Sequence, residues 1–315
     1  MVQAWPPTGR RYVVPMTAFP VWQLRGRTLT LERPLVMGVM NVTPDSFSDG
    51  GLHFSLADAE RRVVAMIDEG VDIVDVGGES TRPQGALPVS VSEELARVIP
   101  VIEAIARRDS HVVISVDTVK SQVAAVAIVA GAHVVNDVSA LRLDPSMAGV
   151  IAGTGAGAIL MHSRGGVADM GTYLHADYAE DVLDVVAREL ATQVAVARTA
   201  GIAREAIVLD PGLGFAKRPQ DSLRILARLD RLAALGYPLA IGASRKRFIG
   251  SLTGVTTPTA RVHGSVGAAV AAYERGAVIF RVHDVAATRQ ALDVAAALRR
   301  AAAAPADAPR EAVRR

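Results

Sequence analysis

The sequence alternates regularly between short apolar segments and longer helix-like segments, and this pattern constrains the fold most strongly. Eight segments rich in Val and Ile predict strands, at 35–41, 71–77, 111–117, 133–137, 157–162, 206–210, 238–243 and 277–283. Most are nearly continuous apolar runs, which is typical of parallel strands buried on both faces. Segments rich in Ala, Leu, Arg and Glu predict helices between them, for example at 56–69, 92–107, 120–130 and 178–199. The chain therefore consists of eight strand–helix pairs, of which the fourth, with its helix near 146–151, has the weakest pattern.

Strict alternation of strands and helices predicts a parallel sheet, and eight pairs favour an α/β fold of the (β/α)₈ TIM-barrel type. A doubly wound sheet is the alternative, but its G-x-G-x-x-G fingerprint does not follow the first strand. Two short alternating runs about Arg25 and Gly26 precede that strand. They predict an N-terminal β-hairpin that caps the bottom of the barrel.

The barrel accounts for most of the chain. We predict one barrel domain over residues 21–300, a flexible N-terminal arm over 1–20 and a flexible C-terminal tail over 301–315.

Composition excludes several classes of protein. Half of the 315 residues are hydrophobic and 21% are charged, so a large core is available. The 34 basic residues nearly balance the 32 acidic ones and are scattered, which argues against a nucleic-acid partner. Cysteine is absent, which excludes disulfides and thiolate metal sites. No apolar run is long enough to span a membrane and no signal peptide is evident, so we expect a cytoplasmic protein.

Polar or ionisable side chains follow the predicted strands at the point where each strand ends. In a barrel these ends meet at one mouth, where the loops build the active site. The residues are Asn41, Glu79, Ser80, Thr81, Arg82, Asp117, Asn136, Asp137, His162, Asp210, Ser244, Arg245, Lys246, Arg281, His283 and Asp284. A single Asp after a strand is more often a helix cap or a turn residue. Eight such ends together favour a binding site.

Four of these residues would suit a flat heterocycle that carries an amino group and ring N–H donors. Asp117, Asn136 and Asp210 offer acceptors and amide donors, and Lys246 supplies a cation for a ring carbonyl or nitrogen. The set contains no obvious covalent nucleophile. The alternative is a purely structural role, in which Asp117 caps the following helix and Asp210 forms a turn.

Arg281 and His283 lie two residues apart on the last predicted strand and should project to one side of it. With Arg82, and with the helix that follows Ser244, they predict an anion pocket suited to phosphate. The alternative for His283 is a core histidine paired with Asp284. We prefer the anion role because a buried Arg281 without an anion would be costly.

The metal expected from the sequence is magnesium. Asn41 and Asp45 offer oxygen ligands, and Mg²⁺ prefers oxygen and commonly completes its shell with substrate phosphates. The phosphate-loop motif G-x-x-x-x-G-K-[ST] is absent, so the phosphate donor is not an ordinary nucleotide of that class.

Long motifs in the chain resemble those of dihydropteroate synthases. The first runs from Gly38 to Gly51 (GVMNVTPDSFSDGG) and the second from Val74 to Pro83 (VDVGGESTRP). Further matches follow in family order: SVDT at 115–118, VNDV at 135–138, LMH at 160–162, LDPGLGF at 209–215, GASRK at 242–246 and FRVHDV at 280–285. The resemblance spans roughly residues 35–285.

The resemblance implies a transferase of folate biosynthesis. It would condense 6-hydroxymethyl-7,8-dihydropterin diphosphate with 4-aminobenzoate to give 7,8-dihydropteroate and pyrophosphate, and sulfonamides would mimic the aminobenzoate. Matched position by position, the pterin would be held by Asp117, Asn136, Asp210 and Lys246. The diphosphate would be held by Asn41, Arg82, Arg281 and His283, with Asn41 as the magnesium ligand. The aminobenzoate would lie near Phe47, Thr81, Pro83, Phe215 and Lys246.

The implied mechanism is an SN1-like, magnesium-assisted displacement in which Asp117, Asp210, Lys246, Arg281 and His283 are the catalytic residues. The segment from Thr43 to Gly51 would be a mobile lid that keeps water from the reactive cation. Arg247 stands where many relatives carry Ser, so it could pair with the benzoate carboxylate or face solvent.

Two other functions remain as alternatives: a barrel that transfers methyl from methyltetrahydrofolate to a corrinoid protein, and a non-catalytic paralogue that only binds pterin. The apolar outer segment 267–273 and the family resemblance both suggest a homodimer.

Overall fold

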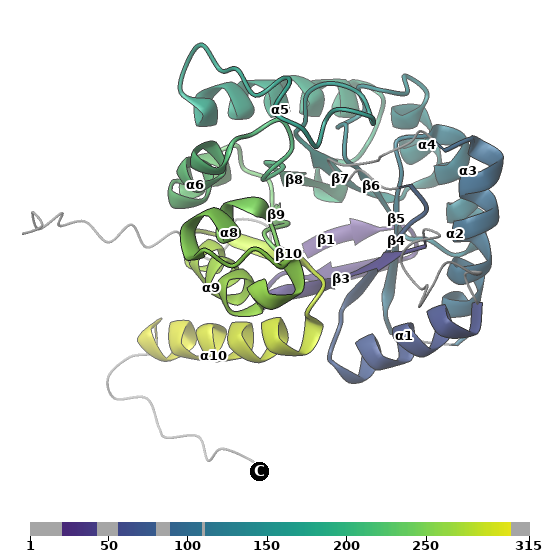
Figure 1. Cartoon of the computed structure of the whole chain (residues 1–315). Coiled ribbons are helices and arrows are strands. Elements are labelled where there is room, and N and C mark those ends of the chain that lie inside the picture. The colour runs from purple at the N-terminus through teal and green to yellow at the C-terminus, as the bar shows by residue number, and fades with distance from the viewer. Residues whose placement is uncertain (1–20, 43–55, 80–88, 109–110, 304–315) are drawn as a thin grey trace, which may run out of the picture.

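The computed structural model describes residues 21–42, 56–79, 89–108 and 111–303 and contains a closed parallel barrel. Its strands follow one another around the barrel in the order β10-β3-β4-β5-β6-β7-β8-β9, and helices surround them (Figure 1). A separate two-stranded antiparallel sheet, β1 with β2, precedes the barrel in sequence. The predicted TIM barrel with an N-terminal hairpin is therefore confirmed.

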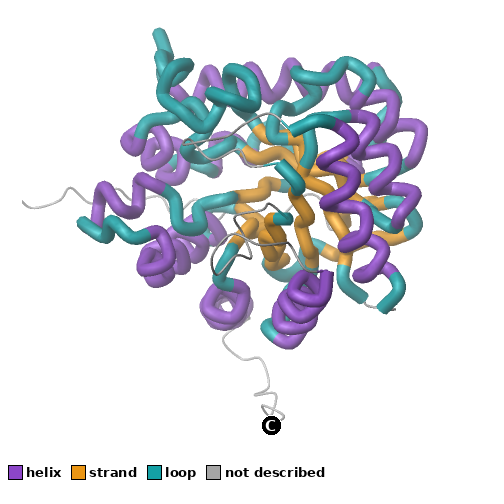
Figure 2. Tube along the Cα trace, turned by 45° about the vertical axis from the view of Figure 1, so that its right-hand side comes forward, coloured by secondary structure: helices purple, strands orange, loops and turns teal. Residues whose placement is uncertain are grey.

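The strands are β1 (Val21–Leu24), β2 (Arg27–Thr30), β3 (Leu35–Asn41), β4 (Ile73–Gly77), β5 (Val113–Asp117), β6 (Val134–Asp137), β7 (Gly157–Met161), β8 (Ile207–Asp210), β9 (Leu239–Ile241) and β10 (Ala277–Val282). The helices are α1 (Leu56–Asp68), α2 (Val91–Ala106), α3 (Ser121–Ala130), α4 (Met147–Thr154), α5 (Val182–Thr199), α6 (Pro219–Ala227), α7 (Asp230–Ala233), α8 (Arg247–Thr253), α9 (Val262–Tyr273) and α10 (Val285–Ala303). Two 3₁₀ turns complete the described elements, η2 (Arg204–Ala206) and η3 (Pro258–Arg261). The tube view in Figure 2 shows the strands enclosed by these helices.

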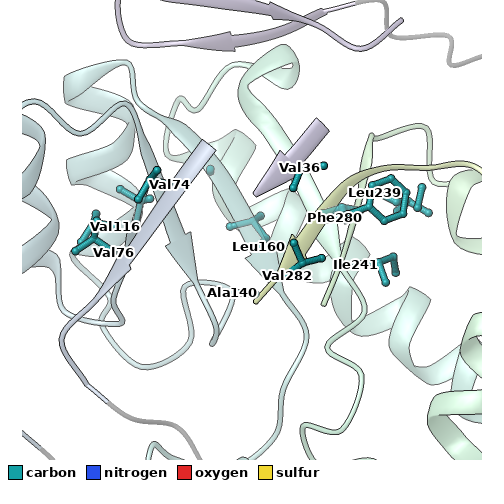
Figure 3. Close-up of a cluster of buried hydrophobic side chains, with 14 of the residues drawn as sticks. Val36, Val74, Val76, Val116, Ala140, Leu160, Leu239, Ile241, Phe280 and Val282 are labelled. Carbon is teal, nitrogen blue, oxygen red and sulfur yellow. The ribbon is translucent and has the colours of Figure 1, made fainter. Parts of the chain in front are cut away.

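Alternation along each strand divides its side chains between two environments. Residues of one parity, such as Val74 and Val76 on β4, belong to the large apolar cluster between barrel and helices (Figure 3). Residues of the other parity, such as Ile73, point into the barrel. Both environments are apolar for most of the strand length, which explains the nearly continuous hydrophobic runs.

Observed element boundaries differ from the predicted ones where local capping decides them. The fifth helix begins at Val182 and not at Tyr178, because the Asp181 carboxylate caps it by accepting from the Leu183 N–H. The strand predicted at 238–243 is only Leu239–Ile241, because the chain then turns sharply through Arg245. The weakly patterned fourth helix is present as α4.

The predicted termini lie mostly outside the described residues. Nothing of 1–20 or 304–315 is described, while α10 continues to Ala303. No helix in the described part of the chain combines the length and apolarity needed to cross a membrane.

The hairpin closes the amino-terminal end of the barrel. Trp22 and Leu24 of β1 are buried against inward-pointing residues from the first layer of the barrel, including Met37 and Ile73. The Trp22 indole Nε1–H donates to the Ala206 carbonyl oxygen at 2.9 Å. Gly157 permits this approach, since a Cβ there would lie 2.4 Å from Leu24 Cδ2. The bottom of the barrel is therefore a packed apolar plug.

We predict that Trp22→Ala lowers the free energy of unfolding by about 3–5 kcal/mol, the range expected for a large core aromatic. Trp22→Phe should cost about 1–2 kcal/mol because it mainly loses the indole hydrogen bond. Denaturant unfolding followed by circular dichroism measures both. Gln23→Ala, on the exposed face of the same strand, is the matched control. A Trp22→Ala variant as stable as this control would contradict the plug.

Candidate active site

Those of the predicted polar residues that the structure describes meet at the carboxyl end of the barrel. Strand register places them at one level, because Asn41 pairs with Gly77, Gly77 with Asp117, and Asp117 with Asn136. On the other side, Met161 of β7 lies opposite Asp210 of β8. The structure therefore brings together side chains that are far apart in the sequence, as the barrel hypothesis requires.

Arg281 of β10 is the central cation of this mouth. Its Nε donates to Asp75 Oδ2 at 2.7 Å and its Nη2 to Asp117 Oδ2 at 2.6 Å. The anions that compensate Arg281 are thus two carboxylates of the protein itself, which corrects the inference that Arg281 needs phosphate to be stable. A quarter of its side chain remains exposed, so it can also contact a ligand.

Asp75 is a site residue that the sequence analysis missed. It is fully buried in the middle of β4, where it also accepts from Asn136 Nδ2 at 3.1 Å. Among the described residues, its Oδ1 and the hydroxyl of the neighbouring Ser115 have no hydrogen-bond partner. An incompletely satisfied buried carboxylate is costly to stability. The available signal was a single charge inside the apolar run IVDVG.

Three acceptor atoms remain free of protein partners within the described structure. Asn136 must present its Oδ1 to the mouth, because its Nδ2 is committed to the carboxylate of Asp75. Asp117 uses Oδ2 for Arg281 and retains Oδ1. Asp210 accepts from the Gly212 N–H through Oδ1 at 2.7 Å and retains Oδ2. Asp210 is therefore a turn residue and also a candidate ligand-binding residue.

Burial moves the pKa values of three side chains at the mouth toward neutral pH. Loss of hydration raises the pKa of Asp117 to about 7, although the charge of Arg281 opposes this shift. Burial likewise raises the pKa of Asp210 above its ordinary value. Burial and the nearby Arg281 lower the pKa of Lys246 to about 8. Shifts of this kind concentrate at functional sites.

The backbone before Lys246 adopts a strained conformation that Asp284 and Arg261 stabilise. Arg245 has φ +59°, a left-handed value that is unfavourable for a residue with a side chain. Its guanidinium forms two bonds with Asp284, at 3.0 and 2.6 Å. Arg261 donates to the carbonyl oxygens of Arg245, Val255 and Thr256 at 3.0, 2.8 and 2.5 Å. These contacts direct Lys246 toward the mouth.

His283 is held by Ser244 and not by Asp284, which is occupied by Arg245. The Ser244 Oγ accepts from the His283 backbone N–H at 3.2 Å and lies 3.0 Å from the ring Nδ1. Burial, together with the charge of Arg281, lowers the pKa of His283 to about 3, so the ring is neutral. The hydroxyl then donates to Nδ1, which leaves the proton on Nε2 as a donor for an anion.

One side of the mouth is apolar. The ring of Phe215 lies 4.2 Å from Lys246 Nζ and packs on a small cluster from neighbouring loops and strand ends: Val119, Val138, Met161 and Met170. Phe215 was predicted from its sequence motif, whereas the two methionines were not. The Arg247 side chain contacts the protein instead of facing solvent. It donates to the Gly171 carbonyl oxygen at 2.7 Å, and its guanidinium lies over the Tyr173 ring.

Two strand-end residues face away from the proposed ligand groups. The Asp137 carboxylate builds the following turn by accepting from the N–H groups of Ser139 and Leu141. His162 is buried between Glu189 and Lys217. The contacts of Asp137 lie in its own turn, and those of His162 lie on α5 and in the loop after β8. A polar strand end alone therefore does not identify a ligand-binding residue.

Several predicted residues lie outside the described part of the structure, namely Asp45, Phe47, Ser80, Thr81, Arg82 and Pro83. The predicted lid, Thr43 to Gly51, also lies outside it. Asn41 is described, at the end of β3. Within the described residues, no group of three or more His, Cys, Asp or Glu could hold a metal ion by itself.

Comparisons with known proteins agree with this geometry. Residues 37–283 match the family model described as pterin binding enzyme. The chain is 47% identical to dihydropteroate synthase of Escherichia coli (strain K12) over 270 residues, which cover 86% of this chain and 93% of the relative.

Solved structures give the same result. Dihydropteroate synthase of Xanthomonas albilineans with 4-aminobenzoic acid superposes with a TM-score of 0.83 at 45% identity, covering 91% of this chain and all of that one. The Yersinia pestis enzyme with a sulfonamide drug complex gives a TM-score of 0.82 at 42% identity, covering 89% and 99%. The chain thus belongs to the dihydropteroate synthase family of pterin-binding enzymes.

Proposed function

We propose that the chain condenses 6-hydroxymethyl-7,8-dihydropterin diphosphate with 4-aminobenzoate to form 7,8-dihydropteroate and pyrophosphate. The observation that carries the proposal is the arrangement at the mouth, where unpaired acceptors lie beside the Arg281 cation and the His283 N–H donor. Family membership supports the same reaction. The protein is accordingly a transferase.

The pterin would bind through its amino group and ring N–H groups. Asp117 Oδ1, Asn136 Oδ1 and Asp210 Oδ2 supply acceptors, and Lys246 supplies a donor for the ring carbonyl or a ring nitrogen. Since these atoms are positioned by Arg281, Asp75 and the Gly212 turn, they are fixed before the ligand arrives. Preorganised polar atoms in a buried site discriminate strongly between ligands that pair with them and ligands that do not.

The diphosphate would lie against Arg281 and His283, with Arg82 as a further cation. Asn41 at the end of β3 offers one amide oxygen to Mg²⁺. This supply fits a magnesium ion that takes its remaining ligands from the diphosphate and water, since the described residues offer no full ligand set of their own. When bound, the ion would balance part of the charge of the leaving diphosphate.

The aminobenzoate would lie on the apolar side of the mouth, against Phe215 and Lys246. Departure of the diphosphate, assisted by Arg281 and His283, would leave a cation at the exocyclic methylene of the pterin. Asp117 and Asp210 would stabilise that cation before the arylamine attacks it. Because an arylamine is already nucleophilic, electrostatics and positioning suffice for the attack, and the proton that the nitrogen loses after forming the C–N bond passes to water or to the released pyrophosphate, so no general base is assigned.

The alternatives are less well supported. A corrinoid methyltransferase or a silent pterin-binding paralogue would not need the Arg281 and His283 donors beside the pterin acceptors. The cytoplasmic location stays a prediction. A homodimer stays one too, and exposed Val294 and Leu298, one turn apart on α10, are compatible with it.

The direct test of the proposed function is a product assay. With both substrates and Mg²⁺, we expect dihydropteroate and pyrophosphate in equal amounts; without aminobenzoate, pyrophosphate release should be slow. A chelator should lower the rate and added Mg²⁺ should restore it. Absence of product at saturating substrates would refute the enzyme function, and methyl transfer from methyltetrahydrofolate would favour the corrinoid alternative.

We also predict a bell-shaped pH dependence of kcat/KM. The rate constant should fall as the pH drops through about 7, because protonation of Asp117 removes an acceptor and the partner of Arg281. It should fall again above about 8, because Lys246 loses its proton. Asp75→Asn removes a negative charge that raises the pKa of Asp117, so the acidic limb should move to lower pH. An acidic limb that stays unchanged in this variant would contradict the assignment.

A further inference from the structure

Lysine is rare in this chain and occurs only beside the mouth of the barrel. Of the 34 basic residues, three are lysines and the other 31 are arginines. Lys120, Lys217 and Lys246 follow the carboxyl ends of β5, β8 and β9. Lys120 pairs with Glu79 and Glu94, and Lys246 faces Phe215. Lys217 has no part in the proposed mechanism. An ammonium is compact and has three rotatable donors, so Arg cannot replace it at a tight site.

Three acceptors surround the Lys217 ammonium. Its side chain is almost completely buried, with 1% of its surface exposed. Nζ lies 2.8 Å from His162 Nδ1, 3.3 Å from the His162 carbonyl oxygen and 3.0 Å from the Phe215 carbonyl oxygen. Burial lowers the pKa of Lys217 to about 7, but three acceptors match the three N–H bonds of the charged form and favour it over a neutral amine, which has two. Lys217 therefore connects the end of β7 with the loop after β8.

The contact of His162 Nε2 with Glu189 determines which ring nitrogen of His162 carries the proton. Its Nε2 lies 2.8 Å from Glu189 Oε2 on α5, and Glu189 also pairs with Arg164. Burial, with the charge of Lys217, lowers the pKa of His162 to about 4. The ring is therefore neutral, donates from Nε2 to Glu189 and accepts from Lys217 at Nδ1. Glu189 lines a cavity of about 170 Å³, so this chain of contacts runs from the surface to the loop that carries Phe215.

The loop after β8 needs such an anchor. Ala216, next to Phe215, has φ +47°, a left-handed conformation that is unfavourable for alanine. Its N–H donates to the Met170 carbonyl oxygen at 2.7 Å, and its carbonyl oxygen accepts from the Tyr178 hydroxyl at 3.1 Å. The Phe215 carbonyl is fixed by Lys217, and the Phe215 ring then lies against Lys246 Nζ. Moving this carbonyl would move the ring.

We propose that Lys217 is a positioning residue for the arylamine: by fixing the Phe215 main chain, it sets the ring on which Lys246 and the aminobenzoate rest. The proposal rests on the proposed function for its substrate but not for its geometry. Lys217 should therefore affect the aminobenzoate side of the reaction and leave pterin recognition, which depends on Asp117, Asn136 and Asp210, largely unchanged.

The geometric part can be tested without substrates by NMR. Protein labelled with ¹³Cε-lysine gives three lysine signals, which substitution of each lysine assigns. Protons above an aromatic face shift upfield, so the Lys246 signal should lose this shift in Phe215→Leu and also in Lys217→Met. Loss in Phe215→Leu with an unchanged Lys246 signal in Lys217→Met would overturn the proposal.

The catalytic part is tested by steady-state kinetics. In Lys217→Met, KM for 4-aminobenzoate should rise about tenfold and KM for the pterin diphosphate should stay within about twofold, as expected for loss of one charge-assisted contact. Phe215→Leu should give the same pattern, and the double variant should add little to either. Equal changes in both KM values, or additive effects in the double variant, would overturn the positioning role.

A matched pair at His162 keeps the test valid if Lys217→Met does not fold. His162→Asn places an oxygen near the position of Nδ1 and keeps an acceptor for Lys217, whereas His162→Gln replaces only the Nε2 end. We expect His162→Gln to raise KM for aminobenzoate more than His162→Asn does; the reverse order would count against the proposal. Trp22→Phe controls for general loss of stability and should leave both KM values unchanged.

If the wild type forms no dihydropteroate, the proposed function is wrong, whereas the NMR result still decides whether Lys217 positions Phe215.

Discussion

The placement of one guanidinium between two carboxylates inside the barrel determines the rest of the site. Arg281 holds Asp75 and Asp117, and Asp75 in turn orients Asn136. A buried ion pair gives little net stability because desolvation offsets the attraction. Its value here is geometric: Asp117 and Asn136 each use one side-chain atom for a protein partner and retain the other as an acceptor for the mouth, while Asp75 stays fully buried as their common support. Removal of Arg281 would leave two buried anions side by side and would release Asp117, whereas Asp210 would still be held by the Gly212 N–H.

The amino-terminal end of the barrel contributes stability, and the carboxyl end carries the candidate active site. At the amino-terminal end the hairpin buries Trp22 and Leu24 against an apolar layer, with few polar atoms to satisfy. At the carboxyl end burial costs stability, as the unpartnered Asp75 Oδ1 and the left-handed Arg245 indicate. A well-packed bottom can offset a strained top, because both ends share the same strands.

The sequence was sufficient to predict the fold and to predict which of the described strand-end residues share the mouth. Continuous apolar strands ending in polar residues define a barrel, and register then brings Asp117 and Asn136 together. The partners of Arg281 could not be predicted, because Asp75 and Asp117 are 206 and 164 residues away and a lone charge in an apolar run carries no sign of its partner. Lys217 was missed because its side-chain partner, His162, is 55 residues away in the sequence. The sequence did not decide between two roles for Arg247, because its contact with Tyr173 depends on the path of a long loop.

The central claim is that strand-end acceptors fixed by the barrel bind a pterin, and Asp210 tests it best because a turn role could explain it equally well. Titration calorimetry with 6-hydroxymethylpterin should show affinity about 100-fold weaker in Asp210→Ala than in the wild type, the loss expected for a charged acceptor. Circular dichroism should show an intact fold. Asp137→Asn, a strand-end carboxylate used only in its own turn, should retain the wild-type affinity. Unchanged affinity in Asp210→Ala would reduce Asp210 to the residue that closes the Gly212 turn and would contradict the account.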